Sequence, residues 1–419
     1  MYRKIMGFLK AWKENKHRKP LILQGARQVG KTYSILEFGR THYENVAYFN
    51  FETNPKLNET FEENISPDYL IPILSHIAGQ TIVKEKTLIV FDEVQLCERA
   101  LTSLKYFCED APDYHIVVAG SLLGVAVNRA KFSFPVGKVD MKTLYPMDME
   151  EFMLALGEDD LVEQIKKCFS TDTPLPSALH DAAMQLYRKY LVVGGMPDVV
   201  QTYVDTHDIG KVVRLQRNIL ELYRQDISKY SEGAEKVRIK AIFDSIASQL
   251  DDKNRRFILN RIDENGRMNR YENSFMWLSD AGVALPSYNV TEPQAPLQLN
   301  EKRNLFKLFM GDTGLLCASC MENIQFELLQ GNMDVNMGSI LENVFAQSIK
   351  SGGFSLNYFE SKKYGELDFV IQNGLKIDLL EIKSGNDYQK HSALNKVSAV
   401  ENWKFGRKIV FCKGNVEQK

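Results

Sequence analysis

Short apolar runs separated by longer mixed stretches characterise the amino-terminal part of the sequence. The runs cover residues 20–24, 45–51, 86–93, 114–120 and 137–144. Most are rich in aliphatic, β-branched or aromatic residues, as strands buried in a parallel sheet are. The stretch after the first run is compatible with a helix. The pattern predicts an α/β fold, a doubly wound parallel sheet of five strands with its helices.

Helical spacing dominates the chain from residue 146 to about residue 235. Apolar residues recur every three or four positions in 150–156, 186–191 and 212–230. Residues 194–197 read Gly-Gly-Met-Pro, which predicts a turn because glycine permits positive φ and proline does not continue a helix. We therefore expect a helical region with one sharp turn.

A small helix-turn-helix with a wing is expected next. Helices are predicted at 237–250 and 269–279, with a short element at 257–259 between them and a strand at 283–285 after them. The region contains several arginines: Arg255, Arg256, Arg261, Arg267 and Arg270. Arginines suit contact with DNA phosphates. They are also common on solvated faces, and winged helices also bind proteins, so DNA contact and a purely structural role both stay open.

The carboxyl-terminal part combines a helix with a β-hairpin. Residues 338–346 have helical apolar spacing, with Glu342 among them, and 358–360 predict a strand. Two further strands are predicted at 365–371 and 377–383, joined by an Asn-Gly turn. This part is therefore expected to be a separate α/β unit.

The loop after the first predicted strand has the pattern G-x-x-x-x-G-K-[ST]. Its residues are Gly25, Ala26, Arg27, Gln28, Val29, Gly30, Lys31 and Thr32. Glycines let the backbone amides converge on an anion, and the following helix directs its positive end to the same place. We expect Lys31 to reach the β- and γ-phosphates of ATP and Thr32 to supply a hydroxyl to Mg²⁺. The strand before the loop and the helix after it favour this interpretation over a glycine turn with a stray lysine.

Two acids, Asp92 and Glu93, end the third predicted strand. Ligands bind at this edge of open α/β sheets. We expect Asp92 to hold Mg²⁺, directly or through water, and Glu93 to polarise the attacking water as general base. A solvated acidic turn is the alternative, and the phosphate-binding pattern upstream argues against it.

The predicted hairpin carries a second group of charged residues. Asp368 lies on one strand, and Glu381 and Lys383 lie on one face of the next, because side chains alternate along a strand. Two acids can hold one or two Mg²⁺ ions, and a lysine beside them can orient water or stabilise negative charge. Glu-x-Lys is also common as a surface pair, so a purely structural role is the alternative.

Composition adds little to this picture. The chain has 419 residues and 48.0 kDa, with 44% hydrophobic and 25% charged residues, as expected of a globular protein of two or three domains. The formal net charge is −2 and the pI about 6.4, so any nucleic-acid surface must be local. No signal peptide or membrane-spanning run is convincing, which predicts a cytoplasmic protein without a membrane partner.

The order of these parts resembles a prokaryotic family in which an AAA-type ATPase is joined to a C-terminal domain of unknown function with a nuclease-like fold. The resemblance spans nearly the whole chain and is carried by residues 25–32, 88–93, 119–121, 134–137, 194–197, 306–316, 368 and 381–383. The adjacent Asp92 and Glu93 resemble the AAA, RecA and helicase branch. The group of Glu342, Asp368, Glu381 and Lys383 resembles the PD-(D/E)XK nuclease superfamily, a fold that also serves as a non-catalytic scaffold.

For such a family the resemblance implies ATP binding, hydrolysis and a helix-turn-helix between ATPase and nuclease-like domain. It makes Ser121, just past the fourth predicted strand, a candidate sensor of the γ-phosphate, with a plain glycine-serine turn as the alternative. It also implies an arginine contributed by a neighbouring domain or subunit, which makes a homo-oligomer a candidate assembly. The sequence does not choose among the candidates Arg27, Arg40, Arg129 and Lys138, the last of which stands where related sequences often have arginine.

Four parts are expected: a P-loop ATPase domain at 1–150, a helical lid or linker at 151–235, a winged-helix-like module at 236–300 and a PD-(D/E)XK nuclease-like domain at 301–419. The expected cofactors are ATP and Mg²⁺, and DNA is the candidate partner. The expected function is an ATPase that repositions the later domains on DNA. The alternative is an ATP-gated protein-interaction switch whose nuclease-like domain does not cut, while a small-molecule kinase is disfavoured by the adjacent acids Asp92 and Glu93.

Overall fold

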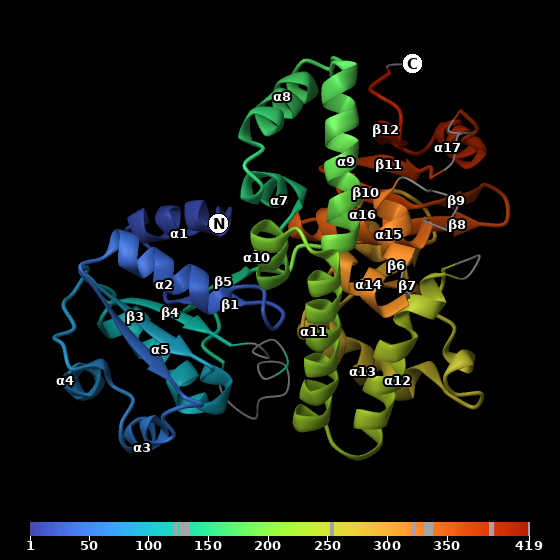
Figure 1. Ribbon diagram of the computed structural model, residues 1–419. Coiled ribbons are helices and arrows are strands. Elements are labelled where there is room, and N and C mark those ends of the chain that lie inside the picture. Colours follow the sequence, from blue (N-terminus) through green and yellow to red (C-terminus); the bar gives the residue numbers. More distant parts are fainter. Residues whose placement is uncertain are drawn as a thin grey trace. The chain divides into compact units, whose positions relative to one another are not determined.

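The five predicted amino-terminal strands form one parallel sheet in the computed structural model (Figure 1). The strands pair in the order β2-β3-β4-β1-β5. Their bounds are β1 (Leu21–Gln24), β2 (Asn45–Asn50), β3 (Thr87–Asp92), β4 (His115–Ala119) and β5 (Asp140–Thr143). The expected α/β fold with a five-stranded parallel sheet is confirmed.

The central strands of this sheet are buried on both faces, which explains their unbroken apolar runs. An aromatic cluster lies on one side of the sheet. The ring of Phe91 contacts the rings of Phe49, Phe51 and Phe61, and the rings of Phe51 and Phe61 contact each other, with centroids 5.5 to 6.0 Å apart. The helices of this part are α1 (Ile5–Glu14), α2 (Lys31–His42), α3 (Lys56–Glu63), α4 (Pro67–Ala78) and α5 (Glu98–Asp110).

The structure describes residues 1–120, 125, 134–251, 255–320, 324–330, 338–384 and 389–417. The chain divides into two units, Met1–Tyr145 with Asp280–Gly282, and Pro146–Ser279 with Val283–Lys419. No helix among the described residues has the length and apolar character that crossing a bilayer requires.

The second unit begins with the expected helices. They are α7 (Met149–Ala155), α8 (Asp159–Ser170), α9 (Ser177–Val193), α10 (Pro197–Thr206), α11 (Ile209–Tyr230), α12 (Gly233–Leu250) and α13 (Met268–Asp280). Asp148 and Glu151 form a capping box at the start of α7. Gly194, with φ +73°, ends α9, and Pro197 is the first residue of α10, so the expected turn is present.

Two sheets follow in the second unit, one ordered β7-β6-β8-β9 and the other β10-β11-β12. The strands are β6 (Ala284–Val290), β7 (Glu301–Met310), β8 (Asn357–Ser361), β9 (Gly365–Leu367), β10 (Phe369–Asn373), β11 (Lys376–Ile382) and β12 (Phe405–Phe411). The helices here are α14 (Thr313–Cys320), α15 (Ile324–Leu329), α16 (Gly338–Ser351) and α17 (Ser392–Ser398). The boundary expected at residue 300 falls between β6 and β7, which pair antiparallel.

The hairpin of β10 and β11 is confirmed as an antiparallel pair. The single strand expected at 365–371 is wrong, because the chain leaves one sheet and enters the other at Asp368. Before it, β9 pairs with β8, and after it β10 pairs with β11. The Asp368 carboxylate accepts a hydrogen bond from the backbone N–H of Ile382, with Oδ2 and N 2.6 Å apart. Its side chain therefore stabilises the crossing between the sheets.

Candidate functional site

The loop between β1 and α2 has the tightly curled backbone that its glycines predict. Gly25, Gln28 and Gly30 all have positive φ, at +146°, +66° and +87°. A Cβ on Gly25 would lie 2.2 Å from the carbonyl oxygen of Leu144, so no larger residue fits there. The loop leads directly into the first turn of α2, whose backbone N–H groups have no partner within the helix and favour an anion.

Lys31, the first residue of α2, is folded back over this loop. Its Nζ donates to the carbonyl oxygens of Gly25 and Ala26, each 2.8 Å away, and only 7% of the residue is exposed. Burial lowers the pKa of Lys31 to about 8, against the opposing effect of the nearby Glu93 and Asp92 carboxylates. The ammonium is thus held by two neutral acceptors, which phosphate oxygens can replace with stronger, charge-assisted bonds.

Thr32 and Asp92 meet at the carboxyl edge of the sheet. The Thr32 hydroxyl donates to Oδ2 of Asp92 at 2.8 Å, and the Tyr48 hydroxyl donates to the same oxygen at 2.8 Å. Hydroxyl and carboxylate oxygens are the ligands that Mg²⁺ prefers, so the two predicted residues fit this ion. Burial, with a smaller contribution from the Asp92 carboxylate, raises the pKa of Tyr48 to about 12. The sequence did not indicate Tyr48, because an aromatic residue within a strand is usually a packing residue.

Glu93 directly follows β3 in a left-handed conformation, with φ +52°. It is half-buried, and its Oε2 accepts a hydrogen bond from Nε2 of Gln95 at 2.5 Å. In the sheet β4 lies between β1 and β3, so its carboxyl end lies between the phosphate-binding loop and Asp92. The predicted sensor Ser121, which follows β4, lies outside the described residues.

The candidate arginine finger stays unassigned. Arg40 pairs with Glu37 of its own helix, with Nη2 and Oε1 2.7 Å apart, and Lys138 pairs with Glu109 at 2.8 Å. Arg129 lies outside the described residues. Exposed ion pairs of this kind contribute little energy, so neither pair prevents its cation from binding a phosphate instead.

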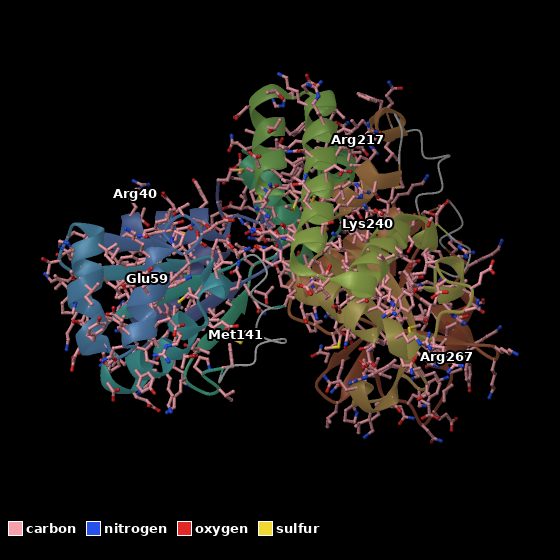
Figure 2. The ribbon with its side chains drawn as sticks, turned by 90° about the horizontal axis from the view of Figure 1, so that it is seen from below. Arg40, Glu59, Met141, Arg217, Lys240 and Arg267 are labelled. Atoms are coloured by element: carbon pink, nitrogen blue, oxygen red, sulfur yellow. The ribbon has the colours of Figure 1, made fainter. Side chains whose placement is uncertain are left out.

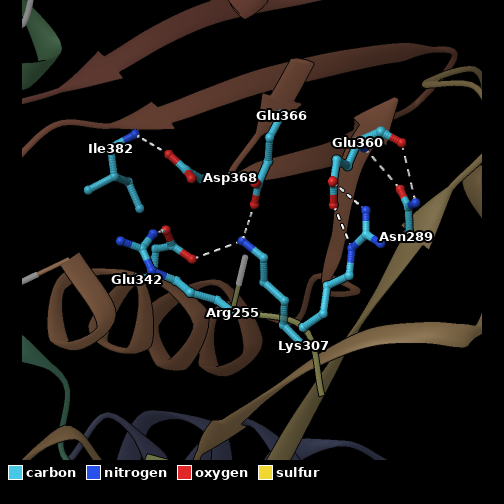
Figure 3. A network of polar contacts seen from close by, with 9 residues as sticks. Arg255, Asn289, Lys307, Glu342, Glu360, Glu366, Asp368 and Ile382 are labelled. Atoms are coloured by element: carbon cyan, nitrogen blue, oxygen red, sulfur yellow. Dashed lines mark hydrogen bonds and ion pairs between the residues drawn. The ribbon is translucent and has the colours of Figure 1, made fainter. Parts of the chain in front are cut away.

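In the second unit, the predicted Glu342 is part of a buried charged network (Figure 3). It lies in α16 and is 1% exposed. Its Oε2 is 3.0 Å from Nζ of the fully buried Lys307, and its Oε1 pairs with Arg255. Lys307 also pairs with Glu366 at 2.6 Å. Glu342 and Glu366 thus share Lys307, and Arg255 pairs with Glu342 as well, so the network contains two acids and two cations.

The other three predicted residues lie on or beside β11. The backbone bond from Ile382 places Asp368 next to this strand, and Glu381 pairs with Lys383, with Oε1 and Nζ 2.6 Å apart. The second carboxylate oxygen of Glu381, Oε2, is buried and has no hydrogen-bond partner in the described structure. Two acids and a lysine are thus brought together, but no group of three or more potential ligands among His, Cys, Asp and Glu occurs in the described ranges.

Two of the five arginines near the predicted winged helix are partly buried and form ion pairs with acids. Arg255 binds the α16 carboxylate described above, and Nε of Arg256 donates to Oε2 of Glu360 at 2.7 Å. These ion pairs favour the structural interpretation of Arg255 and Arg256, and phosphate contact by the arginines of this region stays a prediction. Arg267 and Arg270 lie at the surface (Figure 2 labels Arg267).

Family models match three parts of the chain. Residues 17–153 match the family model described as an AAA domain. Residues 184–325 and 337–419 match two domains of unknown function, DUF8612 and DUF4143. The nuclease-like interpretation is therefore not confirmed by the family that covers it. No curated protein sequence matches the chain.

Several solved structures are similar in outline. A Walker-type ATPase of Pyrococcus abyssi is 14% identical with a TM-score of 0.45, over 76% of this chain and 96% of the other. The ORC2 protein of Aeropyrum pernix, in its ADPNP-ADP complexes, is 12% identical with a TM-score of 0.37, over 79% and 95%. We draw no functional conclusion from likenesses this distant. Residues 17–153 match the AAA domain model and contain the five-stranded parallel sheet and the phosphate-binding loop, which together support a nucleotide-binding domain of the ATPase type.

Proposed function

We propose that this protein hydrolyses ATP at the loop of residues 25–32 and uses its nucleotide state to control DNA binding or processing by the second unit. The observation that carries the proposal is the convergence of three groups at one sheet edge. The Lys31 ammonium, the Thr32 hydroxyl and the Asp92 carboxylate lie there with Glu93 as the next residue.

Each of these groups has a distinct task in phosphoryl transfer. Lys31 exchanges its two carbonyl acceptors for β- and γ-phosphate oxygens, and the curled loop directs backbone N–H groups at the same phosphates. Mg²⁺ held by Thr32 and Asp92 would neutralise charge on the β- and γ-phosphate oxygens. Glu93 accepts the proton of the attacking water, and Gln95 orients its carboxylate through the 2.5 Å hydrogen bond.

The DNA role is supported by separate features of the second unit. Arg261, Arg267 and Arg270 are exposed, and arginines of this kind contact phosphates without reading sequence. The buried, unpaired oxygen of Glu381 beside Asp368 suits one divalent cation, with Lys383 adjacent to stabilise negative charge.

ATP turnover with Mg²⁺, measured alone and with single- or double-stranded DNA, tests this function. We expect turnover that DNA stimulates and that Glu93→Gln abolishes. The matched control is Glu59→Gln, since Glu59 is an exposed acid on α3. Absence of ATP binding in calorimetry would refute the whole proposal. ATP turnover that does not change when DNA is added would refute the proposed control of DNA binding or processing.

A second candidate is an ATP-gated protein-interaction switch with a non-catalytic second unit. The neutralised Glu342 favours it, because that carboxylate is bound by Lys307 and Arg255. Plasmid nicking with Mg²⁺ or Mn²⁺ distinguishes the two candidates. Nicking that is lost in Asp368→Ala and kept in the exposed-site control Glu401→Ala supports the nuclease, and no nicking by a protein that turns over ATP supports the switch.

A further inference from the structure

A buried arginine near the amino terminus links the phosphate-binding loop to the end of the sheet. Arg3 is only 5% exposed. Its Nη1 donates to the carbonyl oxygen of Val29 in the loop at 3.0 Å, and its Nη2 donates to the carbonyl oxygen of Tyr145 at 2.8 Å. A guanidinium is planar and rigid, so it fixes the spacing between its two acceptors. The positions of these two carbonyls are therefore coupled.

Tyr145 belongs to a short connector, residues 144–147, that leads out of β5. At its start, the N–H of Leu144 donates to the carbonyl of Gln24 at 2.8 Å, next to the phosphate-binding loop. At its end, the N–H of Met147 donates to the carbonyl of Gly195 at 2.6 Å. Only Pro146, whose φ is fixed by its ring, separates Tyr145 from Met147. The connector is thus hydrogen-bonded within the first unit at its start and within the second unit at its end.

Further hydrogen bonds lead from Met147 to α16 within the second unit. The Tyr190 hydroxyl donates to the carbonyl oxygen of Met147 at 2.7 Å and accepts a hydrogen bond from Nε2 of Gln347 at 3.1 Å. Tyr190 is 1% exposed and Gln347 is 3% exposed, so water does not compete for these bonds. Gln347 lies in α16, the helix that also carries Glu342.

We propose that Arg3 is a positioning residue that transmits occupancy of the phosphate-binding loop to α16, through the connector and the Tyr190 hydroxyl. The proposal rests on the proposed function in one respect, since it requires the loop to bind a nucleotide. Phosphates draw the loop backbone toward them, and the carbonyl of Val29 moves with it. Arg3 passes that shift to Tyr145, and the connector passes it to Tyr190 and Gln347.

Hydrogen exchange of the full chain, with and without ATPγS and Mg²⁺, tests this coupling. In the wild type we expect nucleotide to change exchange at least about five-fold in the loop, in 186–196 and in 339–351, the low end of allosteric coupling. In Arg3→Met the change stays in the loop and disappears from the two distant segments. Arg3→Lys, which keeps the charge and a donor, restores part of it. The matched control Lys10→Met, at an exposed cation of α1, behaves as the wild type.

A second variant keeps the test decisive if Arg3→Met does not fold. Tyr190→Phe removes one hydroxyl and keeps the ring, so we expect nucleotide still to affect the connector but not 339–351. Calorimetry on the same samples reports nucleotide binding separately. Binding without any distant change in the wild type overturns the coupling alone, as does an unaltered change in both variants. Absence of binding overturns the coupling together with the proposed function.

Discussion

Asp312, in the loop between β7 and α14, offers a sharp test of how the second unit is stabilised. The residue is 1% exposed, and its carboxylate accepts backbone hydrogen bonds from Gly195 at 2.7 Å and from Leu315 at 3.0 Å. It therefore holds the turn after α9 against the start of α14. Burial nevertheless raises the pKa of Asp312 to about 6, since the backbone bonds offset only part of the desolvation.

This raised pKa has a definite consequence for stability. The reference pKa is 3.8, so the folded protein keeps the Asp312 proton between about pH 4 and pH 6 while the unfolded chain releases it. The stabilisation of the folded state that comes from binding this proton is fully present below pH 3.8 and is lost as pH rises through 6. A difference of about 2 pKa units corresponds to about 3 kcal/mol in the free energy of unfolding.

The assay compares wild type and Asp312→Asn in urea titrations from pH 4 to pH 7.5. Asparagine does not titrate, so the wild-type advantage over the variant should shrink by about 3 kcal/mol across this range. Loss of one acceptor for a backbone N–H adds an offset of about 1–3 kcal/mol at every pH. The exposed Asp198, changed to Asn, serves as the control.

The outcome that refutes the reasoning is a difference between wild type and Asp312→Asn that does not vary with pH. That result would mean that the backbone hydrogen bonds compensate burial fully. A difference that grows with pH would show that they outweigh it. The control variant separates both outcomes from a general effect of removing one negative charge.

Three further predictions concern the first unit. ATP-analogue affinity should fall by up to tenfold per unit above pH 8, because Lys31 with its pKa of about 8 must be protonated to bind phosphate, and Lys31→Arg should flatten this fall in a fluorescence titration. Glu93→Gln should retain ATP affinity within about threefold and lose turnover by about 10²-fold or more, and equal turnover would exclude Glu93 as base. Gly25→Ala should lower the free energy of unfolding by about 2 kcal/mol or more, since its Cβ meets the Leu144 carbonyl, whereas Gly7→Ala, with open space around it, should be neutral or slightly stabilising.

The first unit could be predicted closely because its signals are local. Each strand is a continuous apolar run, and the spacing of Lys31, Thr32, Asp92 and Glu93 follows directly from the loop and strand that carry them. The structure brings Thr32 and Asp92 into hydrogen-bond contact, although 60 positions separate them.

The second unit was less predictable because its contacts are between distant segments. Arg255 and Arg256 follow a predicted helix and look like surface cations, yet their partners lie 87 and 104 positions away. Arg3 has no local feature that distinguishes it from other basic residues near the terminus. The strand break at Asp368 depends on a partner sheet that no periodicity reveals.

Lys307 has a practical consequence for following the second unit in solution. Its side chain has no exposed surface and is enclosed by two carboxylates and the ring of Tyr358. An amine-acylating reagent can modify it only after the surrounding structure opens. The acylation rate of the peptide that contains Lys307, measured by mass spectrometry, would therefore report how often that structure opens. Surface lysines would be acylated without delay and serve as the reference.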